Sequence, residues 1–96
     1  MAPREMMMVF SYDVSDDRRR RRVAKRLEDA MTRVQKSVFE ARMSRLAADA
    51  LARDVAAMIG PGDSLRVYAV GNAGLARSAV FGAAVPFERP EGYWLM

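Results

Sequence analysis

The apolar segment MMMVFSYD at residues 6–13 predicts the first strand of the chain. Strand side chains alternate between two faces, so the alternate positions from Met6 to Tyr12 share one face and those from Met7 to Asp13 share the other. Because both faces are largely apolar up to residue 10, the pattern favours a central strand. Asp13 then falls at the C-terminal end of this strand, where functional groups gather in layered α/β folds.

The pattern after this strand predicts a helix over residues 17–30. The polar segment SDD at residues 15–17 suits the N-cap and first turn of a helix, where negative charge is favourable. We therefore interpret Asp16 and Asp17 as capping residues. Apolar positions spaced by four and by seven or eight residues form the buried stripe of this helix, which is Val23, Leu27 and Ala30 or Met31.

The segment RVQKSVFEARM at residues 33–43 has strand composition, and the pattern leaves open one kinked strand or a tight pair. Ser44 is a candidate cap for a second helix over residues 45–59, which Gly60-Pro61-Gly62 would end. The remaining strands are expected at residues 65–70, at residues 79–85, where the pattern is weaker, and at residues 92–96.

This order of elements predicts an α+β fold, a ferredoxin-like sandwich with a mostly antiparallel sheet and two helices on one face. The length of 96 residues suits a single domain. Residues 1–5 are expected to be an N-terminal extension, and residues 86–96 a C-terminal tail. The helices leave the other face of the sheet open, so we expect a homodimer that pairs two sheets.

The amino-acid composition limits the kinds of site and reaction that this chain can support. The chain has no cysteine and no histidine, which excludes disulfides, Cys/His zinc sites and a histidine proton shuttle. Hydrolysis would need carboxylates, hydroxyls, arginine or a hard metal held by oxygen. The net charge is +4, and the basic residues gather between positions 18 and 36, which favours a polyanionic partner. No apolar run reaches the roughly 20 residues of a membrane span, so we expect a cytoplasmic protein.

Four segments together resemble a known family: Tyr12-Asp13-Val14 after the first strand, the arginine-rich helix, RVQKSVFE at residues 33–40, and LRVYAV at residues 65–70. They resemble the small CRISPR-associated protein two family. The resemblance implies a ferredoxin-like homodimer with facing sheets, whose C-terminal strands cross to the partner subunit. It also implies a role in spacer acquisition, in which the dimer bridges copies of the CRISPR integrase and holds duplex DNA. Some members of the family are metal-dependent endonucleases on RNA or DNA.

The resemblance also assigns residues. The metal-binding aspartate of the family corresponds to Asp13, with Mg²⁺ or Mn²⁺ as the ion. The helix arginines correspond to Arg20 and Arg22, to within one residue of register, and the arginine before VQ to Arg33. The aromatic residue of SVF corresponds to Phe39. Two features depart from the family: no glycine lies shortly before RVQ, and the tail PFERPEGYWLM follows no family pattern.

Each candidate also has a plainer interpretation. Asp13 alone is equally typical of a helix entry, and only two copies across a twofold axis would give a metal site. Ser37 has no base beside it, so we interpret it as a packing residue. Tyr12, Gln35 and Phe39 are expected to support the site or a dimer interface. The residues expected to bind nucleic-acid phosphates are Arg18, Arg19, Arg20, Arg22, Arg33 and Lys36.

The leading hypothesis from the sequence is a CRISPR adaptation protein that binds nucleic acid and supports spacer integration into the CRISPR array. A metal-dependent endonuclease centre at Asp13 would accompany this role. One alternative is a non-catalytic scaffold that clamps DNA for the CRISPR integrase. Another is a toxin-type ribonuclease on the same fold. The sequence leaves open whether duplex DNA or single-stranded RNA is preferred.

Overall fold

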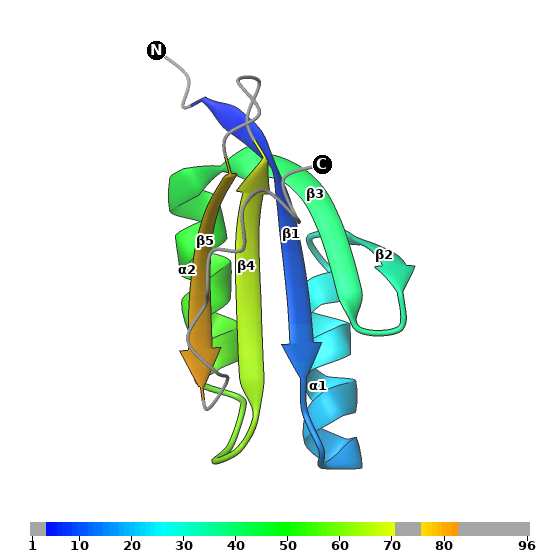
Figure 1. Cartoon of the computed structure of the whole chain (residues 1–96). Helices are drawn as coiled ribbons and strands as arrows, with labels where there is room; N and C mark the ends of the chain where they lie inside the picture. The colour runs from blue at the N-terminus through cyan, green and yellow to red at the C-terminus, as the bar shows by residue number, and fades with distance from the viewer. Residues whose placement is uncertain (1–3, 71–75, 83–96) are drawn as a thin grey trace.

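The computed structural model describes residues 4–70 and 76–82 of the chain. Figure 1 shows the arrangement of the elements in this part of the chain. Their order is β1 (Glu5–Asp13), α1 (Asp17–Glu28), β2 (Thr32–Gln35), β3 (Val38–Ser44), α2 (Arg45–Ala56), β4 (Ser64–Val70) and β5 (Ala76–Gly82).

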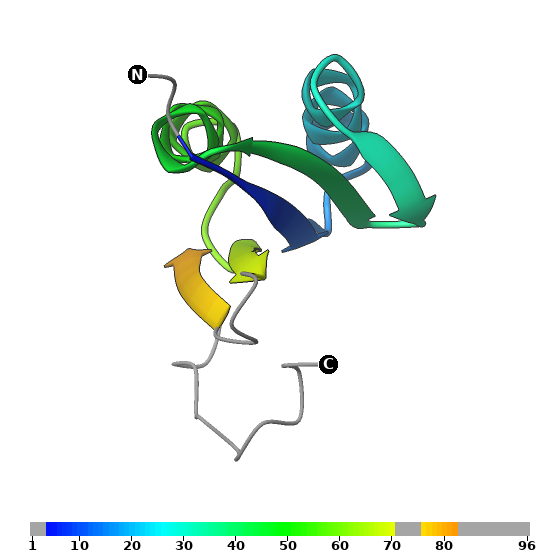
Figure 2. The ribbon, with the colours of Figure 1, turned by 90° about the horizontal axis from the view of Figure 1, so that it is seen from above.

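The strands form one sheet in the order β2-β3-β1-β4-β5, and every neighbouring pair is antiparallel. Both helices lie on the same face of this sheet, as the view from above in Figure 2 shows. The first four strands and the two helices have the connectivity of a ferredoxin-like fold, and β5 extends the sheet beside β4. The predicted α+β sandwich is confirmed. Neither helix in the described part of the chain is long and apolar enough to cross a membrane.

Strand β1 is central, as its two apolar faces predicted. Phe10 pairs with Phe39 on one side and with Val67 on the other, and all three side chains are buried beneath the helices. The opposite face of β1, which includes Met7 and Val9, is only half-buried. The core of the domain therefore lies between the helices and one face of the sheet.

The helices are shorter than the sequence pattern predicted. Helix α1 ends at Glu28 rather than residue 30, because the N–H groups of Ala30 and Met31 both turn back to the Leu27 carbonyl. Met31, and not Ala30, completes the buried stripe. Helix α2 ends at Ala56 rather than residue 59, and a turn closed by the N–H of Met58 follows it.

The structure decides between the two alternatives for residues 33–43 and moves the start of one predicted strand. Residues 33–43 form the tight pair β2 and β3, with Lys36 and Ser37 in the turn and a register shift between Arg33 and Gln35. Strand β5 begins at Ala76, three residues before the predicted start, because it pairs along the whole length of β4. The strand expected at residues 92–96, the whole of the tail at residues 86–96, and residues 1–3 lie outside the described residues, whereas Glu5 already belongs to β1.

Candidate nucleic-acid site

The site begins at the end of β1, where Asp13 pairs across the sheet with Ser64 of β4. Asp13 is exposed, whereas Val14 behind it is buried in the core. Helix α1 starts at Asp17, so three residues connect strand and helix. The position of Asp13 relative to the helix therefore depends on the conformation of this short β1–α1 loop.

The capping prediction for Asp16 is confirmed. Its Oδ2 accepts a hydrogen bond of 2.9 Å from the backbone N–H of Arg19, which satisfies one of the free donors of the first helical turn. The same hydrogen bond lowers the pKa of the Asp16 carboxyl. Asp17 lies in that turn and forms an ion pair with Arg20. Ser44 caps α2 in the same manner, through the N–H of Ala47.

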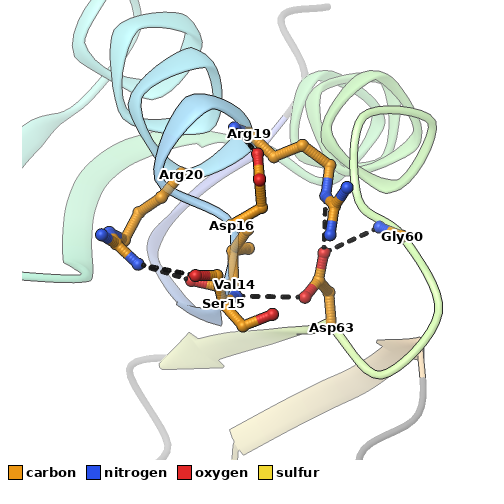
Figure 3. A network of polar contacts seen from close by, with 7 residues as sticks. All are labelled: Val14, Ser15, Asp16, Arg19, Arg20, Gly60 and Asp63. Carbon is orange, nitrogen blue, oxygen red and sulfur yellow. Dashed lines mark hydrogen bonds and ion pairs between the residues drawn. The ribbon is translucent and has the colours of Figure 1, made fainter.

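Arg20 holds the β1–α1 loop. Its Nη1 donates to the carbonyl oxygen of Val14 at 3.0 Å and to that of Ser15 at 3.4 Å, as Figure 3 shows. The guanidinium also pairs with Asp17. This arginine therefore holds the loop in shape and also lines the pocket described below.

Arg19 lies on the other side of the loop and is paired with Asp63. Its Nε lies 3.1 Å from the Asp63 Oδ2, and Asp63 is 1% exposed. Asp63 also accepts from the backbone N–H groups of Ser15 at 3.2 Å and Gly60 at 2.8 Å. The N–H of Gly60, followed by those of Ser15 and Arg19, lowers the pKa of Asp63. Arg19 was predicted to bind phosphate, and in the structure its guanidinium forms this ion pair with Asp63.

An aromatic and cationic stack flanks the loop. Tyr12 and Phe39 are stacked with ring centres 6.2 Å apart, and the guanidinium carbon of Arg33 lies 5.1 Å from the centre of the Phe39 ring. The Tyr12 hydroxyl donates to the Lys36 carbonyl at 3.5 Å. Burial raises the pKa of Tyr12, and the charge of Arg33 partly offsets this. Strands β1, β2 and β3 therefore place these aromatic and cationic side chains beside the β1–α1 loop.

These elements enclose an open pocket of about 520 Å³. Tyr12, Val14 and Ala24 contribute to its lining. The charged and hydroxyl side chains that line it are Asp13, Arg20, Arg21, Arg33, Lys36 and Ser37. Four cations thus meet one carboxylate in a hollow whose size suits a small group such as a phosphate with its sugar.

The family model described as CRISPR associated protein Cas2 matches residues 6–77, from the start of β1 into β5. The chain belongs to the Cas2 family. The family predicted from the sequence is therefore confirmed.

Several Cas2 proteins are similar over most of the chain. The CRISPR-associated endoribonuclease Cas2 3 of Chloroflexus aurantiacus is 36% identical over 90 residues, which cover 93% of this chain and 97% of the relative. The CRISPR-associated endoribonuclease Cas2 2 of Synechocystis is 38% identical over 82 residues, which cover 83% and 88%. A crystal structure of cas2 superposes with a TM-score of 0.64 at 29% identity, over 69% of this chain and 75% of that one.

The structure groups only part of the predicted set around this Cas2 pocket. It brings Asp13, Arg20, Arg33, Lys36 and Ser37 together, with Tyr12 at the edge. Arg18 and Arg22 are exposed on other sides of α1, and Gln35 is exposed on β2, so none of them lines the pocket. Phe39 is fully buried and does not line the pocket, but it contacts the lining residues Tyr12 and Arg33.

The sequence analysis missed Arg21 and Asp63. Arg21 lies next to Arg20 and one turn before Ala24, so the helical period places it on the pocket side. The rotation of α1 about its own axis, relative to the sheet, determines which arginines face the pocket. Asp63 follows the Gly60-Pro61-Gly62 turn, in which Gly62 has a φ of +86°. Asp63 could have been identified in the sequence as a carboxylate placed between a glycine-containing turn and a buried strand.

The described part of one chain provides few ligands for a divalent cation in the pocket. Mg²⁺ accepts one or two carboxylates and completes its shell with waters and phosphate oxygens. Asp13 is the single carboxylate among the lining residues, and residues 4–70 and 76–82 contain no cluster of three or more acidic ligands. One chain therefore provides one ligand for such an ion. A second carboxylate would have to come from another copy of the chain.

Proposed function

We propose that this Cas2 protein is a nuclease that binds nucleic acid through its phosphates and acts on a phosphodiester held in the pocket. The observation that supports this most directly is the meeting of Asp13 with four cations in one hollow. The relatives named CRISPR-associated endoribonuclease support cleavage of RNA as the activity of this chain as well. We also propose that this protein takes part in spacer acquisition, alongside the CRISPR integrase.

Arg21 and Lys36 are the side chains best prepared to bind phosphate. Neither side chain forms a hydrogen bond or ion pair with any residue that the structure describes, although both line the pocket. Arg33 pairs with Glu28 at 3.5 Å, but both side chains are half-exposed. Exposed ion pairs of this kind contribute little, so a phosphate can replace Glu28. Arg18 and Arg22, on the exposed sides of α1, would bind the backbone beyond the pocket.

Asp13 would hold Mg²⁺ or Mn²⁺ together with the Asp13 of a second copy. It shares the strand register of Met7, Val9 and Ser11, which is the face that the helices do not cover. A homodimer built on that face would bring two such carboxylates toward one axis. A bound Mg²⁺ would supply positive charge that polarises the scissile phosphate. Arg33 and Lys36 would hold the same phosphate in place and offset its charge.

A second candidate is a scaffold without chemistry, which clamps duplex DNA for the CRISPR integrase. The single carboxylate of the pocket favours it, because cleavage then depends on an exact dimer geometry. Arg21 and Lys36, whose side chains have no partner in the described part of the chain, serve a clamp equally well. The two functions share the binding site and differ only in whether Asp13 takes part in a reaction.

Purified protein incubated with labelled single-stranded RNA and with duplex DNA tests the proposal. Parallel reactions contain Mg²⁺, Mn²⁺ or EDTA, and binding is measured in each. Nuclease function predicts saturable cleavage that the chelator abolishes and that scales with protein across chromatographic fractions. Tight binding without cleavage of either substrate would favour the scaffold instead.

A further inference from the structure

The backbone of Ser15 is held through both its N–H and its carbonyl group. Its N–H donates to the Asp63 Oδ1 at 3.2 Å, and its carbonyl accepts from the Arg20 guanidinium at 3.4 Å (Figure 3). Ser15 lies only two residues after Asp13, and each residue spans at most about 3.6 Å. The position of Asp13 is therefore closely coupled to these two contacts.

Asp63 connects three segments that are distant in the sequence. Its carboxylate accepts from Ser15 in the β1–α1 loop, from Gly60 in the loop between α2 and β4, and from Arg19 on α1. It is 1% exposed, and no buried side-chain polar atom in the described part of the chain lacks a partner. A buried carboxylate with three donors is a fixed anchor, because breaking any contact exposes an unpaired polar group.

On the other side of Asp63, Arg19 packs closely against Gly60. A Cβ atom placed on Gly60 would lie 3.0 Å from the guanidinium carbon of Arg19, closer than ordinary contacts allow. The glycine therefore lets Arg19 lie flat against the loop while its Nε reaches Asp63. Figure 3 shows Arg19 approaching Asp63 from α1, with Gly60 beside them.

We infer that Asp63 is a positioning residue, which fixes the β1–α1 loop so that Asp13 and Arg20 face the same pocket. The catalytic part of this inference rests on the proposed function. Asp63 lies outside the residues that line the pocket, so it acts through Ser15 and Arg19 rather than on the nucleic acid.

Asp63→Asn is the central variant. It keeps the size of the side chain but leaves one acceptor oxygen, so it cannot accept donors on both sides. Arg19→Gln removes the ion pair and leaves the two backbone contacts, so a smaller effect is expected. The matched controls are Asp49→Asn and Arg53→Gln, which change exposed residues of α2.

The experiment measures kcat, KM and nucleic-acid Kd for Mg²⁺-dependent cleavage, well below the Tm of every variant. Amide hydrogen exchange at Ser15 is measured on the same samples. Asp63→Asn is expected to lower kcat by roughly ten- to a hundredfold, since small displacements of reacting groups cost that much. Kd should stay near the wild-type value, and Ser15 exchange should become faster. A variant with wild-type kcat, or with unchanged Ser15 exchange, would overturn the inference.

The two proposals fail separately. If the wild type binds nucleic acid but does not cleave it, the proposed catalysis is lost. Ser15 exchange in Asp63→Asn then decides the positioning inference: faster exchange confined to residues 13–20 supports it, and unchanged exchange overturns it. If Asp63→Asn does not fold, Arg19→Gln is compared with Arg53→Gln: a smaller loss of kcat and a smaller increase in Ser15 exchange would support the inference, and no change in either would overturn it.

Discussion

The guanidinium carbon of Arg33 lies 5.1 Å from the centre of the Phe39 ring, so a buried aromatic side chain supports a cation of the pocket. Phe39 is itself stacked on Tyr12 and is fully buried. This contact joins the core of the domain to the phosphate-binding side chains. Core substitutions here should therefore affect binding as well as stability.

Phe39→Ala should destabilise the fold by about 3–5 kcal/mol, because it opens a cavity under β1 and β3. Urea unfolding measures this change. Leu46→Ala is the control, since Leu46 is 75% exposed and should change stability by less than about 0.5 kcal/mol. Phe39→Leu, which keeps most of the volume, should fold and still bind nucleic acid more weakly than wild type. Equal binding by Phe39→Leu would contradict a supporting role for the ring.

Stability should fall in acid through Asp63. Its folded pKa lies below the usual value of 3.8, so the unfolded chain takes up this proton first as the pH falls. The stabilisation is complete above pH 3.8 and is lost as the pH drops through the folded pKa. Asp63→Asn has no such proton to gain. The difference in urea midpoint between wild type and this variant should therefore narrow from about pH 6 to about pH 3. A difference that stays constant would show that Asp63 does not retain its charge in the folded state.

Arg21→Gln and Lys36→Gln should each weaken nucleic-acid binding without regard to sequence. A side chain that contacts one phosphate contributes to the release of counterions, so the slope of log K against log salt should fall by about 1. Fluorescence anisotropy across a salt series measures that slope. Arg53→Gln, on the exposed side of α2, is the matched control. A slope that Arg21→Gln and Lys36→Gln leave at the wild-type value would remove these residues from the site.

Val9→Glu should disrupt the proposed homodimer. Val9 is half-buried on the sheet face that the helices leave open, where a charge would be desolvated in a sheet-to-sheet interface. Sedimentation measures the mass of the variant, and circular dichroism checks that it folds. Leu46→Glu introduces the same charge on an exposed position of α2 and should remain a dimer. A dimer in both variants would place the interface elsewhere.

Local patterns were sufficient for the elements that hold the site. The apolar character of both faces of residues 6–13 predicted the central strand, and the stripe of Val23 and Leu27 predicted the buried side of α1. Asp16 and Ser44 were identified as caps because capping involves residues only three positions apart. Helix ends were less accurate, since Met58 and Ile59 pack against the core although they follow the end of α2.

Local sequence patterns could not predict contacts between residues that are distant in the sequence. Arg19 finds its partner 44 residues later in Asp63, so an arginine within a basic run becomes part of an internal anchor. Arg21 lines the pocket and Arg22 does not, because the buried residues Val23, Ala24 and Leu27 set the rotation of α1 against the sheet. The composition of the arginine run was informative about the partner, whereas the role of each arginine depends on tertiary structure.

The most direct test of the account compares Asp13→Asn with Asp49→Asn in cleavage of labelled RNA and DNA at saturating substrate and Mg²⁺. Both variants remove one exposed aspartate charge, and only Asp13 lines the pocket. The account predicts that Asp13→Asn loses at least about a hundredfold in rate while its nucleic-acid Kd stays close to that of the control. Cleavage by Asp13→Asn at the rate of Asp49→Asn would contradict it and leave the pocket as a binding site alone.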